Sequence, residues 1–122
     1  ALPGQVDVAS AACRYPGHAY GLDAAMLVFG LNIDCFREIP LSRWDIDIYY
    51  SETFDQFSSS GKSGTKHQGQ LDISELTDFD NKFFGIDAGV AEVMPCQSRQ
   101  VIESSMEAFF LAGFTRDSLQ GF

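Results

Sequence analysis

Basic side chains are scarce in this chain. Eight lysines and arginines stand against 17 aspartates and glutamates, and the 122 residues carry a formal net charge of −9. A protein that binds a nucleic-acid backbone or an anionic membrane needs clustered positive charge, so this composition argues against both kinds of partner. The acidic residues are scattered rather than gathered in blocks, which indicates a solvated surface.

Long apolar runs and paired cysteines are also missing. The longest apolar run, residues 24–29, is too short for a transmembrane helix, so we expect no membrane span. Cys13, Cys35 and Cys96 are widely spaced and include no Cys-x-x-Cys pair, which fits neither a disulfide framework nor a zinc site. We therefore expect an intracellular protein in a reducing compartment, either the cytoplasm or an organelle such as a plastid.

Apolar residues are nevertheless plentiful. They make up 45% of the chain and aromatic residues 13%, so a hydrophobic core is expected rather than a disordered acidic tail. The length allows one domain at most, spanning residues 1–122. The chain begins with Ala1 instead of methionine, which fits either a removed presequence or a part of a longer polypeptide.

Local patterns predict short elements separated by loops. Residues 6–12 favour a strand, which the Pro16-Gly17 turn ends. Residues 24–29 are apolar on nearly all sides and predict a short buried helix, with Asp23 as its N-cap. Gly30 and Asn32 can end this helix, and residues 58–69 are expected to form an exposed loop.

The strongest helix prediction lies near the end of the chain. Pro95 suits a first helical turn and Gly113 a C-terminal stop. Arg99, Glu103 and Glu107 fall four residues apart on one face, where Arg99 and Glu103 can form a weak pair. The other face is wide and apolar and comprises Val101, Ile102, Met106, Phe109 and Phe110.

One segment points to a family. Residues 39–50, IPLSRWDIDIYY, resemble the "VPxxRWDxxxYY" signature near the start of β-ketoacyl synthase domains of polyketide and fatty acid synthases. Residues 12–17, ACRYPG, resemble the "ACRFPG" of these domains, and residues 79–86, FDNKFFGI, resemble their "FDxxFFGI". Residues 94–108 are similar to "MDPQQRLLLE" and the following "EAL", and residues 118–121 to "SLxG". The resemblance covers essentially the whole chain.

The motif residues are expected to have structural roles. They are Cys13, Arg14, Pro16, Gly17, Pro40, Arg43, Trp44, Asp45, Tyr50, Phe83, Phe84, Gly85, Arg99 and Glu103. Three places depart from the family pattern: Pro95-Cys96 replaces Asp-Pro, residues 87–90 replace "SPRE", and Ser10 replaces the small Gly that follows the first strand.

The resemblance implies an α/β fold. We expect an incomplete, thiolase-like N-terminal fragment with one family core strand, short helices and long loops. In that fold, later strands of the chain pair with the first strand on both sides, and they are absent from these residues. A single strand cannot satisfy its backbone groups alone. We therefore expect a chain that is not autonomous, either the start of a longer polypeptide or a subunit docked on others.

The resemblance also implies a reaction. A ketosynthase joins an acyl group to a malonyl unit on an acyl carrier protein, using a cysteine nucleophile and two histidines. None of Cys13, Cys35, Cys96, His18 and His67 matches those positions. We therefore expect no catalytic, cofactor-binding or metal-binding residue in this chain.

Two functions remain open from the sequence. The first is a divergent, truncated ketosynthase-like domain that is non-catalytic on its own and serves as a structural or interaction subunit. The second is the N-terminal portion of an active β-ketoacyl synthase of polyketide or fatty acid elongation, with acyl carrier protein as partner. An unrelated binding module for a cofactor or lipid is a third reading.

Overall fold

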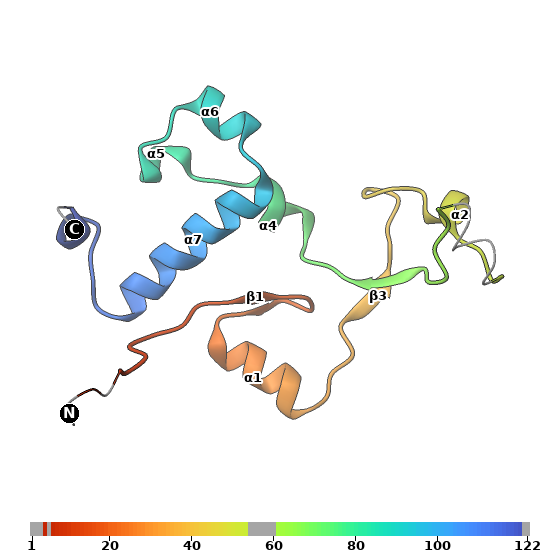
Figure 1. Ribbon diagram of the computed structural model, residues 1–122, viewed down its shortest axis with the longest axis horizontal. Coiled ribbons are helices and arrows are strands. Elements are labelled where there is room, and N and C mark those ends of the chain that lie inside the picture. The colour runs from red at the N-terminus through yellow and green to blue at the C-terminus, as the bar shows by residue number, and fades with distance from the viewer. Residues whose placement is uncertain (1–3, 5, 54–60, 121–122) are drawn as a thin grey trace.

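The computed structural model contains two short antiparallel ribbons and a series of helices (Figure 1). It describes residues 4, 6–53 and 61–120. The first ribbon pairs β1 (Arg14–Tyr15) with β2 (Ala19–Tyr20), and the second pairs β3 (Phe36–Glu38) with β4 (His67–Gly69). In the first, Arg14 faces Tyr20, and in the second, Arg37 faces Gln68.

The helices are mostly short. They are α1 (Leu22–Gly30), α2 (Ile46–Tyr49), α4 (Ile73–Thr77), α5 (Asn81–Phe84), α6 (Ala88–Val93) and α7 (Cys96–Leu111), followed by a 3₁₀ turn at Asp117–Leu119. α7 runs through the middle of the helical part, with β1 and α1 on one side and α4, α5 and α6 on the other (Figure 1). The β3–β4 ribbon and α2 project from this part as an arm.

The turn of the first ribbon requires glycine. Gly17 has a φ of 79°, a left-handed conformation that residues with a side chain rarely adopt. A Cβ placed on Gly17 would also lie 2.5 Å from Cys35 Sγ. The turn therefore brings β1 and β2 against the start of the arm only when no side chain is present at this position.

The predicted strand at residues 6–12 is wrong. None of these residues belongs to a strand, and Val6 and Val8 are 93% and 87% exposed. The segment lies against α7, and Ser10 Oγ donates a 2.6 Å hydrogen bond to the carbonyl oxygen of Ala108 in that helix. A strand needs a neighbour to satisfy its backbone groups, and none is present here among the described residues.

The helix expected at residues 24–29 forms but is longer and far less buried than predicted. It begins after Gly21, which occupies the N-cap position instead of Asp23, and Asp23 lies in the first turn. Ala25 is buried, whereas Met26 and Leu27 are 61% and 63% exposed. Asn32, at a φ of 50°, lies just past the helix end as expected. The apolar surface of α1 has too little of the chain to pack on.

The loop expected at residues 58–69 is wrong at its end. Residues 58–60 lie outside the described part, and His67–Gly69 form β4. Ser63 additionally forms a parallel bridge with Tyr50. Ser, Gly and Lys are frequent in loops, but here the backbone of β3 offers partners that local composition does not reveal.

The helix predicted near the end of the chain is confirmed. α7 starts after Pro95 at the N-cap, and Gly113 follows it with a φ of 88°. The expected pair between Arg99 and Glu103 is replaced by hydrogen bonds from Arg99 to the carbonyl oxygens of Leu76 and Thr77, at 3.0 and 3.2 Å. The polar face of α7 is therefore turned toward α4, while Val101 on the apolar face is 64% exposed.

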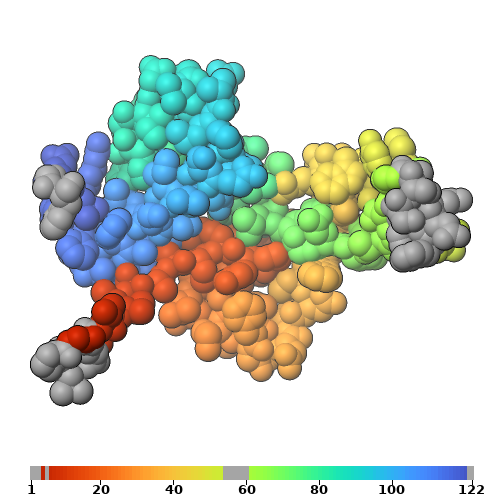
Figure 2. Space-filling model, viewed as in Figure 1, coloured from red at the N-terminus to blue at the C-terminus, as the bar shows by residue number. Residues whose placement is uncertain are grey.

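The core is very small. Among the described residues, the buried hydrophobic side chains are Ala19, Ala25, Ile39 and Ile46. The chain exposes 8947 Å² of surface, whereas a compact monomer of its 13.4 kDa mass exposes about 6,500 Å². The open outline is plain in the space-filling view, where the arm stands apart from the helical part (Figure 2). The α/β fragment with short helices and long connections expected from the sequence is what the structure shows.

Candidate functional site

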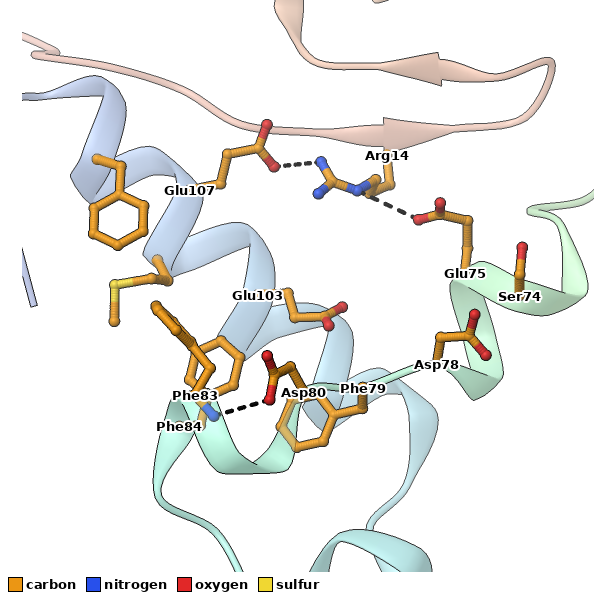
Figure 3. A pocket seen from close by; sticks show the side chains of 12 residues that line it. Arg14, Ser74, Glu75, Asp78, Phe79, Asp80, Phe83, Phe84, Glu103 and Glu107 are labelled. Atoms are coloured by element: carbon orange, nitrogen blue, oxygen red, sulfur yellow. Dashed lines mark hydrogen bonds and ion pairs between the residues drawn. The ribbon is translucent and has the colours of Figure 1, made fainter.

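An open cavity of about 550 Å³ lies where β1, α4, α5 and α7 meet (Figure 3). Five carboxylates and one guanidinium line it, together with several aromatic rings. Its lining comprises Arg14, Ser74, Glu75, Asp78, Phe79, Asp80, Phe83, Phe84, Glu103, Met106, Glu107 and Phe110. The residues come from four separate segments, so the cavity depends on how these segments pack.

Arg14 joins three of those segments. Its Nε lies 3.6 Å from Glu75 Oε2 on α4, and its Nη1 lies 2.5 Å from Glu107 Oε2 on α7. The second contact is an ion pair: Glu107 Oε2 is buried and accepts no hydrogen bond from any residue that the structure describes. The guanidinium also lies 5.8 Å from the centre of the Tyr20 ring. Arg14 is one of the predicted motif residues, and its contacts link β1 to α4 and α7.

Glu103 projects into the cavity from α7 (Figure 3). Burial raises the pKa of its carboxyl group above the usual value, and the nearby Glu75 charge adds to this, whereas Arg14 and Arg99 act in the opposite direction. Within the described part of the chain, its carboxylate has no hydrogen-bond donor or ion-pair partner. Desolvation that the charges of Arg14 and Arg99 offset only in part is therefore the main property of this motif residue.

The other carboxylates of the cavity are engaged locally. Asp80 caps α5 by accepting a 2.9 Å hydrogen bond from Phe83 N. Asp78 accepts a 3.1 Å hydrogen bond from Thr77 Oγ1. These groups hold the backbone turns around the cavity, so they are less available to a ligand than Glu103.

Aromatic rings form the opposite wall. Phe79 and Phe84 stack with their centroids 5.2 Å apart, and Phe83 meets Phe84 edge-on at 4.9 Å. Arg116 lies over the Phe83 ring, 5.7 Å from its centroid. Gly85 ends α5 in the left-handed conformation and allows the chain to turn away from this cluster. Phe83, Phe84 and Gly85 were predicted motif residues, and the structure brings them together.

A second polar junction centres on Asp72, which the sequence did not single out. Arg37 Nη2 donates a 2.9 Å hydrogen bond to its carboxylate, His18 Nδ1 lies 3.0 Å away, and Tyr20 Oη lies at 3.3 Å. The hydrogen bond from Arg37 lowers the pKa of Asp72, and the His18 charge adds to this effect. Burial raises the pKa of Tyr20, with Glu75 and Asp72 contributing. This junction joins the first ribbon to the arm.

The "RWD" motif builds the arm. Arg43 Nη2 donates a 2.6 Å hydrogen bond to the carbonyl oxygen of Leu71, and Asp45 caps α2 through Asp47 N at 3.1 Å. Trp44, another of the predicted motif residues, is 42% exposed. The arm offers Trp44 little of the chain to pack against.

Two further motif residues support the arm. Pro40 accepts a 2.9 Å backbone hydrogen bond from Arg43, which closes a turn. Tyr50 lies under Lys66 Nζ, 4.8 Å from the ring centre, and Lys66 Nζ lies 2.5 Å from Asp47 Oδ1. The Lys66–Asp47 pair was not anticipated, because nothing in local sequence signals which acid a distant lysine will meet.

The thiols and imidazoles do not assemble a reactive centre. Cys13, Cys35 and Cys96 are half-buried free thiols, and no hydrogen bond joins any of them to His18 or His67 in the described ranges. Cys35 packs beneath the Gly17 turn, and the Pro16 ring lies close to Gly69. Residues 4, 6–53 and 61–120 also contain no group of three acidic, cysteine or histidine side chains placed to hold a metal ion. No nucleophile–base pair of acyl transfer is present in this part.

No helix in the part of the chain that the structure describes is both long and apolar enough to cross a bilayer.

Two of the segments that depart from the expected family pattern lie at helix starts in this chain. Asp87, at the start of the altered 87–90 segment, caps α6 through a 2.8 Å hydrogen bond from Gly89 N. Pro95, in the altered 95–96 pair, stands at the N-cap of α7. Helices therefore begin at both of these altered segments.

Residues 4–122 match the family described as "Beta-ketoacyl synthase, N-terminal domain". The chain belongs to this family. It is 34% identical over 116 residues to a phenolphthiocerol/phthiocerol polyketide synthase of Mycobacterium tuberculosis, covering 95% of this chain and 6% of that protein. It is 36% identical over 119 residues to the phthioceranic/hydroxyphthioceranic acid synthase of Mycobacterium bovis, covering 95% of this chain and 5% of that protein.

Solved ketosynthases share the arrangement of this β-ketoacyl synthase segment. A ketosynthase from module 6 of the bacillaene synthase of Bacillus subtilis superposes with a TM-score of 0.77 at 31% identity, covering 92% of this chain and 18% of that one. An oxazolomycin ketosynthase domain of Streptomyces albus gives a TM-score of 0.75 at 28% identity, again covering 92% and 18%. The thiolase-like expectation is confirmed, and the chain spans less than a fifth of these domains.

Proposed function

We propose that this chain is the structural N-terminal segment of a larger ketosynthase assembly and supplies no reacting side chain itself. The observation that carries this proposal is the imbalance of its apolar surface. Within the described ranges, four hydrophobic residues, none larger than isoleucine, are buried, whereas large side chains such as Leu31, Phe36 and Leu41 are 69–79% exposed. Covering such surface contributes roughly 25 cal/mol per Å², so another polypeptide that packs on it stabilises the fold.

The partner in this proposal is the polypeptide that supplies the rest of the ketosynthase fold. Ketosynthase chains cover about five times the length matched here, and they have the same arrangement over residues shared with this chain. Val6 and Val8 lie in an extended, exposed segment that a partner strand can pair with. The free thiols of Cys13, Cys35 and Cys96 fit a reducing compartment, and we place the assembly in the cytoplasm or an organelle such as a plastid.

Native mass spectrometry of the protein isolated from its source tests this proposal. We expect the segment to occur with additional ketosynthase polypeptide, whether covalently continuous or bound. After incubation with an acyl thioester substrate, the acyl group should be found on that polypeptide and not on Cys13, Cys35 or Cys96. A monomer of 13.4 kDa that unfolds cooperatively, or an acyl group on one of these thiols, would contradict the proposal.

A second candidate function concerns the assembly as a whole: an active β-ketoacyl synthase that extends an acyl chain on an acyl carrier protein. What supports it is the similarity over 95% of the chain to proteins named as polyketide synthases. The reaction would use a cysteine and two histidines supplied outside these residues, and no metal. Formation of a lengthened product on acyl carrier protein by the isolated assembly tests it, and an assembly that binds acyl groups without condensing them would speak for the purely structural function.

A further inference from the structure

The cavity between β1, α4, α5 and α7 combines two features that suit one kind of occupant (Figure 3). One side presents the Glu103 carboxylate, and the other presents the faces and edges of Phe79, Phe83 and Phe84. A lysine or arginine side chain matches both features, because its aliphatic stem packs on apolar surface while its charged head meets a carboxylate.

The charges of the cavity favour a cation. Arg14 forms ion pairs with both Glu75 and Glu107, while Asp78 and Asp80 accept hydrogen bonds from the chain around them, so one guanidinium faces five carboxylates. Glu103 forms no hydrogen bond or ion pair among the described residues, although the charges of Arg14 and Arg99 lower its pKa. Because no group of three acidic, cysteine or histidine side chains in the described ranges is placed to hold a metal ion, the excess of negative charge suits a lysine or arginine side chain better than a divalent metal ion, whose hard oxygen ligands must be several.

The aromatic wall is already used in this way from its outer side. Arg116 lies 5.7 Å from the centroid of the Phe83 ring. Aromatic faces attract cations through their negative quadrupole, and this attraction grows when water is excluded. The wall facing Glu103 therefore offers a second position of the same chemistry, which no side chain of the described residues fills.

We propose that the cavity receives a lysine or arginine side chain from the polypeptide that completes the ketosynthase fold, with Glu103 as its counter-charge. This inference rests on the proposed function, since it needs that polypeptide. An acidic or purely apolar group is disfavoured, because it would leave the Glu103 carboxylate desolvated and unpaired. In this chain, burial raises the pKa of Glu103. The incoming cation would lower this pKa again, because a nearby positive charge favours the ionised carboxylate.

Charge reversal with a matched control tests the inference. In the assembly formed by co-expressing this segment with the remaining ketosynthase polypeptide, Glu103→Lys and Glu103→Gln are compared with Glu92→Lys and Glu92→Gln. Glu92 lies exposed on α6 and has no contact among the hydrogen bonds and ion pairs of the described residues. We expect Glu103→Lys to weaken association at least 100-fold and Glu103→Gln about tenfold, with less than twofold changes for both Glu92 variants.

A chemical measurement supplements the variants in case Glu103→Lys fails to fold. Carbodiimide joins a carboxylate directly to a contacting lysine. If the occupant is a lysine, we expect a cross-link from Glu103 to the completing polypeptide in the unaltered assembly. An arginine occupant gives no cross-link, but the weaker association caused by Glu103→Gln is still expected. Equal effects of the Glu103 and Glu92 variants would overturn the inference and leave the proposed function intact. If the unaltered segment binds no ketosynthase polypeptide, both the proposed function and this inference are wrong.

Discussion

Arg14 Nη1 lies 2.5 Å from Glu107 Oε2, and this ion pair ties the first ribbon to the C-terminal half of α7. The same guanidinium reaches Glu75 on α4. Three segments that are distant in sequence thus depend on one side chain. All three partners are partly shielded from water, with 22–34% of each side chain exposed, so the interactions are worth more than those of a fully exposed pair.

Replacing Arg14 should loosen this junction. In the assembled protein, Arg14→Gln removes the ion-pair partner of both Glu75 and Glu107, and we expect the free energy of unfolding to fall by about 2 kcal/mol. Chemical denaturation, through the shift of its midpoint, measures the loss. Lys82→Gln is the control: Lys82 is exposed on α5, so its effect should stay within about 0.5 kcal/mol. Equal losses in the two variants would show that Arg14 acts only through net charge.

The Gly17 turn gives a second prediction. Gly17→Ala places a Cβ 2.5 Å from Cys35 Sγ and forces alanine into a φ of 79°, so we expect a loss of more than about 1 kcal/mol of folding free energy. Adding Cys35→Ala should restore the steric part of the loss but not the backbone part. Gly30→Ala is the control, because this helical position is open and should gain roughly 0.5–1 kcal/mol. Thermal unfolding of these variants and the unaltered protein separates the contributions, and full rescue by Cys35→Ala would contradict the backbone argument.

Asp72 gives a pH prediction. Its pKa is lower in the folded chain than in the unfolded chain, chiefly because of the hydrogen bond from Arg37 and then the charge of His18. Its contribution to stability is therefore present above the unfolded pKa of about 3.9 and is lost as the pH falls through the folded pKa. We expect Asp72→Asn to be less protected than the unaltered chain at pH 6, and the difference to disappear in strong acid. Amide exchange of β3 and β2, compared between the two proteins at each pH, measures this.

The control for this measurement is Asp34→Asn. Asp34 accepts a hydrogen bond from Phe36 N next to β3 but pairs with no basic side chain among the described residues. Its substitution should not change the exchange of β2. If Asp72→Asn and Asp34→Asn alter β2 and β3 alike, the junction at Asp72 does not join the first ribbon to the arm.

Sequence reasoning succeeded where the signal was local or familial. The motif around Arg43 and Asp45 indicated the family, and the pattern from Pro95 to Gly113 predicted α7 at nearly its true length. Both depend on residues close in sequence, or on motifs that retain their order. The structural roles assigned to the motif residues stay a prediction, although Arg14 and Gly17 make contacts that suit it.

The failures share a physical cause. A strand at residues 6–12 needs a paired strand, and a buried α1 needs packing partners. The described residues supply neither, so the strand does not form and α1 stays largely exposed. Periodicity reports which face of an element can be buried, but not whether anything covers it. The junction at Asp72 was missed for a related reason, since charge pairing across distant segments leaves no local pattern.

The exposed surface of α1 gives the last prediction. Met26 and Phe29 are 61% and 55% exposed on this helix. If the completing polypeptide covers them, the double variant Met26→Ser, Phe29→Ser should weaken its association at least tenfold, because roughly 25 cal/mol is lost for each Å² of apolar contact. The same double variant should make the isolated segment less prone to aggregate. Gln97→Ser, at an exposed polar position of α7, should change neither property. Binding and light scattering are measured on the same samples. Better solubility of the double variant with unchanged association would mean that α1 faces solvent in the assembly. The apolar surface that needs a partner would then lie elsewhere, at Val6, Val8 and the arm.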